Sequence, residues 1–158
     1  MNRRFRNSAV GSVVGAALLL AACGSDSDGG AAGDDAGDGG ITVLLSEWAV
    51  EAPESAPAGP VEISAVNEGG EIHELVVVRA DSADDFEVDE TGKVDEEQFA
   101  EGDFVGEISE FEAGTSATGT FDLDAGTYVL FCNIVEEEDS GEFESHFGNG
   151  MVTTIEVS

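Results

Sequence analysis

From Ile41 onward, the chain is divided into short apolar segments by glycine, proline and acidic turns. Residues 61–66 (VEISAV) alternate apolar and polar side chains with a period of two, which predicts a strand with one buried face. No helical period of useful length interrupts these segments. Short strands at this spacing predict an all-β fold, a β-sandwich formed by residues 41–158. The predicted strands are residues 41–48, 61–66, 72–79, 116–123, 126–134 and 151–157.

One long acidic segment, residues 81–103, separates two of these strands. It has room for one short helix around residues 94–100. The same segment contains residues 87–92 (EVDETG), which partly match a calcium-binding EF-hand loop. The match begins with Glu and lacks the bidentate Glu at position twelve, so it indicates calcium only weakly.

The N-terminus has the form of an export signal. Arg3, Arg4 and Arg6 precede an uncharged apolar run, residues 9–22. This run is too short to span a bilayer comfortably, which favours a cleaved signal peptide. It ends in Leu-Ala-Ala-Cys, which resembles the lipobox of bacterial lipoproteins and predicts lipidation of Cys23. The twin-arginine match is partial, so the sequence leaves open whether the Sec or the twin-arginine machinery exports the chain.

After Cys23, residues 24–40 contain only Gly, Ala, Ser and Asp. Such a segment cannot bury an apolar core and is expected to be a disordered tether. The predicted organisation is a signal peptide at residues 1–22, a lipidated tether at 23–40 and one folded domain at 41–158. Lipid chains on Cys23 would anchor that domain on the extracytoplasmic face of a bacterial membrane, in the periplasm or at the cell surface.

The chain is strongly acidic. Removal of the signal peptide leaves Arg79 and Lys93 against 35 acidic residues. Binding to nucleic acid is excluded, because it needs a cationic surface. Dense negative charge destabilises a compact fold unless salt screens it, so the composition favours a halophilic protein from a saline habitat. A merely soluble acidic surface is the alternative.

Few side chains could bind a soft metal. Outside the start Met and the lipobox cysteine, the chain has two His, one Cys and one Met: His73, His146, Cys132 and Met151. Two imidazoles, a thiolate and a weak axial thioether are the ligands of a trigonal blue-copper site, so this inventory predicts one copper per chain. Each residue also has an ordinary interpretation, the histidines as hydrogen-bonded or solvated side chains and the other two as core residues. Copper is favoured because an unpaired thiol in an oxidising compartment is a liability unless something occupies it.

Four segments together resemble small cupredoxins of the plastocyanin and azurin type: ITVLLSEW, PVEISAVNEGGEIHELVVV, AGTYVLFCNI and HFGNGMVTTIEV. The resemblance implies a Greek-key sandwich with copper near one end. It implies His73 as the first histidine ligand and Cys132 as the thiolate at the end of the penultimate strand. His146 is then the second histidine and Met151 the axial ligand. The step between these last two, with Gly150 before the Met, agrees with the family pattern H-x-x-x-G-M.

Two features depart from that family. Glu74 follows the first histidine, where Asn is common, so the side-chain tie across the site is in doubt, although a backbone amide remains to bond the thiolate. Thirteen residues separate Cys132 from His146, where plastocyanins have two. Loop-closure scaling makes this added length worth only about 1.7 kcal/mol, and cupredoxins resembling sulfocyanin also have longer ligand loops. The loop could cover the edge of His146 or surround it with the acidic residues 136–139.

The resemblance implies a function in electron transfer. We expect a membrane-anchored carrier of single electrons, with His146 as the electron port and Phe147 beside it for docking. Its partner would be a cytochrome or a membrane oxidase or reductase, and a monomer is expected. An enzyme is not expected, because a blue-copper site has no open position for substrate. The alternatives are an extracytoplasmic copper carrier or store, and a metal-free β-sandwich that binds a protein partner.

Overall fold

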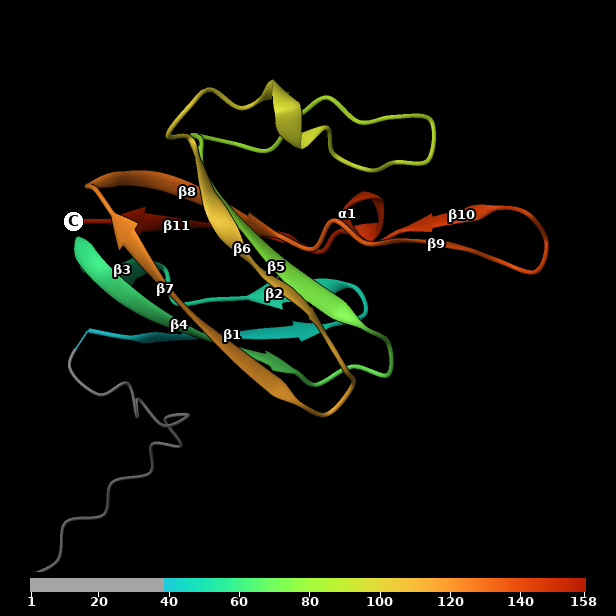
Figure 1. Cartoon of the computed structure of the whole chain (residues 1–158), viewed down its shortest axis with the longest axis horizontal. Coiled ribbons are helices and arrows are strands. Elements are labelled where there is room, and N and C mark those ends of the chain that lie inside the picture. Colours follow the sequence, from blue (N-terminus) through green and yellow to red (C-terminus); the bar gives the residue numbers. More distant parts are fainter. Residues whose placement is uncertain (1–38) are drawn as a thin grey trace, which may run out of the picture. The chain divides into compact units, whose positions relative to one another are not determined.

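The computed structural model describes residues 39–158 (Figure 1). The predicted signal peptide, the lipidation site at Cys23 and nearly all of the predicted tether lie outside these residues and stay predictions. Within residues 39–158, no helix has the length and hydrophobicity needed to cross a membrane.

Two β-sheets face each other in the described chain, as the alternating pattern predicts (Figure 1). The first contains β1 (Ile41–Ser46), β2 (Ala49–Glu51), β4 (Gly59–Asn67) and β7 (Ser116–Leu123). The second contains β3 (Ser55–Ala56), β5 (His73–Arg79), β6 (Phe104–Phe111), β8 (Gly126–Phe131) and β11 (Val152–Val157). The strand orders are β2-β1-β4-β7 and β3-β11-β8-β5-β6. The all-β sandwich is therefore confirmed.

The inner faces of the two sheets form the main core. Along β1, the side chains of Ile41, Val43 and Leu45 are buried while their neighbours are more exposed. The same alternation runs along β4 and the end of β11, because successive side chains of a strand point to opposite faces. Full burial of each such apolar side chain contributes about 1.5–3 kcal/mol. The core thereby fixes β5 and β8, the strands that lead to two predicted ligands.

The second sheet is buried on its outer face too, by residues 81–103, which we call the acidic excursion. Its Val94 is buried in a second apolar cluster with residues of β5 and β8, and its Phe86 and Phe99 pack against that cluster. The two rings meet edge to face, with their centroids 4.9 Å apart. Despite its charge, the acidic excursion thus packs as a layer on the sheet.

The short helix expected around residues 94–100 is present as a single 3-10 turn, η1 (Glu96–Gln98). Asp95 caps it, since its carboxylate accepts a hydrogen bond from the amide of Glu97 at 3.0 Å. The Asp95 side chain therefore fixes where this turn begins.

Several elements were not predicted. β6 lacks a clear period of two, since only Ile108 and Phe111 are buried in it, and its pairing with β5 contains two register shifts. β2 and β3 are too short to give a pattern. The remaining three lie between Cys132 and Met151, and Figure 1 shows them at one end of the second sheet. They are β9 (Val135–Glu137), β10 (Phe143–Ser145) and α1 (His146–Asn149).

Candidate metal centre

Three of the four predicted metal ligands converge at one end of the second sheet. His73 begins β5 and Cys132 follows the last residue of β8, and because these strands are antiparallel neighbours the two residues lie at the same end. His146 begins α1. The Nδ1 atoms of the two histidines are 3.2 Å apart. The sulfur of Cys132 lies 3.4 Å from Nδ1 of His146 and 4.0 Å from Nδ1 of His73.

The spacing of these donor atoms fits one metal ion. For Zn²⁺, bonds to imidazole nitrogen are about 2.0–2.1 Å long and bonds to thiolate sulfur about 2.3 Å. Donor atoms around one such ion therefore lie roughly 3–4 Å apart. The three separations fall in this range, and the group could hold a metal ion. Two imidazoles and a thiol are also the donors that a soft or borderline metal selects.

Met151 lies directly before β11 and is fully buried. Its amide donates to the carbonyl of His146 at 3.0 Å, and its carbonyl accepts from the amide of Cys132 at 3.1 Å. The backbone of Met151 is thus tied to two of the converging residues. Its role as an axial ligand stays a prediction.

The long loop keeps the ligands together because it closes on itself as a hairpin. β9 and β10 pair antiparallel, with Val135 opposite Ser145. Below this pair, the amide of His146 donates to the carbonyl of Ile134 at 3.0 Å. The Ser145 hydroxyl caps α1, and Gly150 ends it in the left-handed conformation that favours glycine, with φ at 115°. The added residues therefore do not separate His146 from Cys132.

All four predicted ligands are shielded from water, with exposed fractions of 0%. Burial raises the pKa of the Cys132 thiol to about 11. Burial also lowers the pKa values of His73 and His146 below their usual range. At neutral pH the metal-free site therefore holds a thiol and two neutral imidazoles. Metal binding must displace the thiol proton, so the metal affinity should fall as pH falls.

Glu74 provides a tie across the site that its replacement of Asn had put in doubt. Its backbone amide lies 3.5 Å from the sulfur of Cys132, and its carboxylate accepts from the amide of Asn133 at 3.2 Å. The Asn133 side chain accepts from the amide of Val94 at 2.7 Å and donates to the carboxylate of Glu96 at 2.8 Å. Burial, reinforced by two nearby carboxylates, raises the pKa of Glu74 to about 7. The acidic excursion is thus hydrogen-bonded to the residue that follows the thiol.

The outer nitrogens of both histidines face carboxylates. Nε2 of His73 lies 3.2 Å from Glu47 Oε1, and Nε2 of His146 lies 3.5 Å from Glu71 Oε2. Within the described chain neither nitrogen has an aligned hydrogen bond. Because burial keeps both imidazoles neutral, these contacts are not ion pairs. Sequence reasoning missed both glutamates as partners of the histidines, because they lie in turns that only the fold brings against the imidazole rings.

His146 does not present an exposed ring edge. Its ring is fully buried, and Trp48 packs edge-on against it with ring centroids 5.1 Å apart. Phe147 is half-buried and packs against Phe131 and Phe86, at centroid distances of 5.5 and 6.2 Å. The second histidine is therefore covered, and the ring that packs on it is that of Trp48. The exposed edge that the resemblance implied for docking is not found here.

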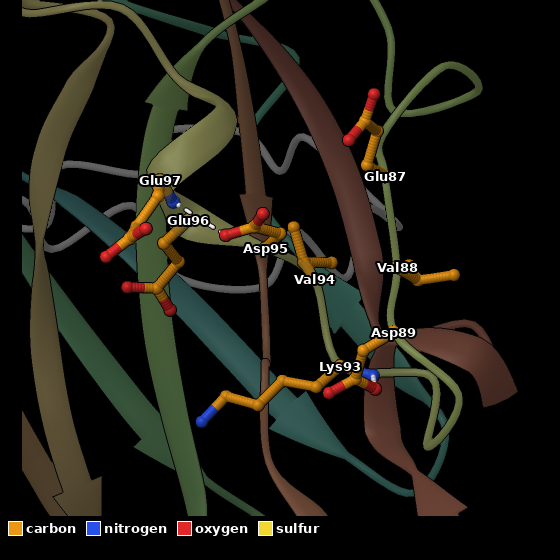
Figure 2. Close-up of a pocket in the computed structure, with 8 residues that line it drawn as sticks. All are labelled: Glu87, Val88, Asp89, Lys93, Val94, Asp95, Glu96 and Glu97. Atoms are coloured by element: carbon orange, nitrogen blue, oxygen red, sulfur yellow. Dashed lines mark hydrogen bonds between the residues drawn. The ribbon is translucent and has the colours of Figure 1, made fainter.

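A hollow of about 460 Å³ lies on the acidic excursion (Figure 2). Its walls are residues 87–89 and 93–97, so it includes part of the segment that partly matches a calcium loop. Asp89 Oδ1 accepts from the hydroxyl and amide of Thr91 at 2.6 and 2.8 Å and from the amide of Lys93 at 3.1 Å. The hydrogen bond from the Thr91 hydroxyl, more than any other cause, lowers the pKa of Asp89. This carboxylate closes its own turn, and the weak calcium prediction gains no support.

Comparison with solved structures identifies the fold. Auracyanin from Roseiflexus castenholzii is 19% identical and covers 78% of this chain and 99% of its own, with a TM-score of 0.55. Auracyanin A, a "blue" copper protein from Chloroflexus aurantiacus, is 16% identical over 75% of this chain and 98% of its own, with a TM-score of 0.53. The azurin Az-iso2 from Methylomonas sp. strain J is 15% identical over 77% of this chain and 99% of its own, also with a TM-score of 0.53. No protein-family model and no curated protein sequence matches the chain. The described residues thus have the cupredoxin fold.

Proposed function

We propose that this protein is a blue-copper electron carrier. One copper would be bound by His73, Cys132 and His146, with Met151 as the axial ligand. The observation that carries this proposal is the convergence of two Nδ1 atoms and one thiol, 3.2 to 4.0 Å apart, in a pocket closed to water. The likeness to auracyanin A, described as a "blue" copper protein, supports the choice of metal.

Copper in such a site supplies a reversible one-electron couple. The protein supplies ligands that are already in place. β5, β8 and α1 fix His73, Cys132 and His146 through backbone hydrogen bonds, so these side chains need not move when the charge at the site changes. The amide of Glu74, directed at the Cys132 sulfur, would stabilise the thiolate and help to set the redox potential.

We propose His146 as the electron port, with electrons reaching its buried ring through Trp48. Trp48 lies edge-on against the His146 ring and is itself only partly buried, so it offers a short route from that ring towards the surface. Phe147 would support this end of the molecule by packing against Phe131 rather than by forming an exposed docking patch.

The location and partners follow from the sequence. We propose that residues 1–22 are removed, that Cys23 is lipidated, and that the domain works at the outer face of a bacterial membrane as a monomer. A cytochrome or a membrane oxidase or reductase would exchange single electrons with it. The excess of acidic residues favours a saline habitat.

The test is to load the mature protein with Cu(II) and record its visible spectrum and a reversible redox titration. One copper per chain and an intense thiolate-to-copper charge-transfer band are expected. Cys132→Ser should abolish the band, whereas Met151→Leu, the matched control on the axial side, should keep the colour and raise the potential. Absence of the band in a chain that circular dichroism shows to be folded would refute the blue-copper assignment.

A copper carrier or store is the second candidate. The observation that favours it is the group of carboxylates, including Glu71 and Glu136, that lies against the covered His146. An electron carrier should retain copper in both oxidation states, whereas a carrier of copper should lose Cu(I) quickly to a competing chelator. Measuring Cu(I) loss beside the rate of electron exchange with a small cytochrome separates the two functions.

A further inference from the structure

The imidazole of His146 separates two groups of possible ligands. Its Nδ1 atom faces His73 and Cys132, which with it form the inner site. Its Nε2 atom faces the opposite way, towards Glu71 and Glu136. One donor atom from each of these three residues lies within 4.8 Å of the others, a spacing at which they could hold a second metal ion. We call Glu71, Glu136 and Nε2 of His146 the outer site.

Negative charge is concentrated at the outer site without a matching positive charge. Glu71 and Glu136 are both partly buried and lie together beside His146. Glu136 and Glu144 face each other across the β9–β10 hairpin, an arrangement of like charges that destabilises a strand pair. Among the described residues no Lys or Arg forms an ion pair with them. A bound cation would relieve this repulsion.

The nitrogen that faces these carboxylates is itself unsatisfied. The side chain of His146 has an exposed fraction of 0%, and its Nε2 atom, 3.5 Å from Glu71 Oε2, has no hydrogen-bond partner within residues 39–158. The buried Oε2 of Glu71 likewise has none. Leaving a buried polar atom without a partner destabilises the folded chain. A cation bound by both Nε2 of His146 and Oε2 of Glu71 would satisfy the two atoms together.

We propose that Glu71, Glu136 and Nε2 of His146 bind a divalent transition cation, and that this outer site receives Cu(II) before it reaches the inner site. One imidazole nitrogen with two carboxylates suits Cu(II) or Zn(II). Nε2 can bind a cation only while it carries no proton. Because Nδ1 faces the inner site and Nε2 faces Glu71, a cation at Nε2 lies on the opposite side of the ring from the inner site. The role as a receiving site rests on the proposed function, whereas the outer site itself does not.

The kinetic test uses the mature protein and Cu(II). Trp48, the only tryptophan of the chain, packs on His146 and should be quenched by Cu(II) at the outer site. In the wild type, quenching should precede the charge-transfer band. In Glu71→Gln/Glu136→Gln, the early quenching should be lost and the band should form at least about tenfold more slowly. Even outer-shell partners of metal ligands are worth about 10- to 100-fold in affinity, which sets this scale.

The control is Glu137→Gln. Glu137 neighbours Glu136 on β9 but points to the other side of the strand and is exposed. The substitution Glu137→Gln removes one charge from the same hairpin as Glu136→Gln. If both single variants slow the formation of the charge-transfer band equally, charge alone steers copper to the protein. That result would overturn the outer site. If Glu71 only accepts a hydrogen bond from the N–H of His146, Glu71→Gln should slow the formation of the band and Glu136→Gln should not. This result would also overturn the proposal.

An equilibrium test keeps the outer site distinct from the proposed function. Cys132→Ser removes the thiolate of the inner site, and Cu(II) affinity is then read from Trp48 fluorescence. Adding Glu71→Gln/Glu136→Gln to this background should weaken Cu(II) binding at least about tenfold, and adding Glu137→Gln should not. If the wild type gives no charge-transfer band but this difference holds, the blue-copper function fails and the outer site stands. If the band forms and the difference is absent, the reverse is true.

Discussion

Two acidic segments flank the candidate metal centre, and they are built in opposite ways. The acidic excursion has eleven Asp and Glu residues in its 23 positions, and residues 135–145 have six in eleven. The excursion nevertheless buries Val94 and packs Phe86 and Phe99 on the second sheet. The hairpin buries no side chain fully, and its Phe143 is 53% exposed. Similar composition thus gives a structural layer in one place and a charged projection in the other, and a few apolar residues make the difference.

The largest expected change in stability comes from a substitution that disrupts the packing of the acidic excursion. Phe86→Ala removes a ring that meets Phe99, Phe131 and Phe147, and should lower the free energy of unfolding by about 2–4 kcal/mol, since the ring is partly buried. Phe143→Ala on the hairpin is the matched control and should change it by less than about 0.5 kcal/mol. Urea unfolding of both variants measures the difference. Equal losses would show that the hairpin also packs on the sandwich.

The second prediction concerns the link from the excursion to the site through Glu74 and Asn133. The pKa of Glu74 in the folded chain is about 7, above its ordinary value of 4.5, so folding favours its protonated form. The resulting stabilisation is fully present below pH 4.5 and is lost as pH rises through 7. With allowance for partial exposure, it amounts to about 2 kcal/mol.

Urea unfolding of the metal-free protein at pH 5 and pH 8 tests this link. The loss of stability between these values should be smaller by most of that amount in Glu74→Gln, whose amide oxygen can still accept from Asn133. Glu62→Gln, at an exposed position on β4, should behave like the wild type. A pH dependence that is the same in all three proteins would contradict the raised pKa.

The third prediction removes the hairpin. Deletion of residues 135–145 leaves a two-residue loop and should change the free energy of unfolding by only about 1 kcal/mol, because the lower closure entropy of a shorter loop offsets the loss of the hairpin's own hydrogen bonds. The copper spectrum should persist, and electron exchange with a small cytochrome should become faster because Glu136 and its acidic neighbours no longer lie beside His146. Loss of copper binding in a folded variant would instead make the hairpin part of the site.

The smallest expected effect is that of salt. Repulsion among the acidic residues should be screened as salt rises to about 1 M, where the Debye length is about 3 Å, so the melting temperature of the metal-free protein should rise by several degrees. Bound copper should raise the low-salt melting temperature, because it binds only the folded chain. The hairpin deletion removes six acids and should reduce the dependence on salt. A melting temperature that is flat or falls with salt would remove the halophile inference.

The sequence predicted the parts of the fold in which one local pattern determines the structure. β4 and β7 follow their period of two, and the inventory of possible soft-metal ligands, together with the family resemblance, predicted His73, Cys132 and His146, which the structure brings together. β6 was missed because register shifts interrupt its alternation. Trp48 and the outer carboxylates could not be found, since their contacts with the histidines depend on how distant turns meet. The burial of His146 likewise depends on these contacts.

The closed base of the β9–β10 hairpin has a consequence for protein engineering. A backbone hydrogen bond joins Ile134 and His146, and Val135 pairs with Ser145. The two ends of the segment between Val135 and Ser145 are therefore held next to each other. A different hairpin of any length, such as an affinity epitope or a peptide chosen to bind an electrode surface, could replace residues 136–144. The grafted segment would then sit a few residues from a redox centre while the spacing of its ligands stayed the same.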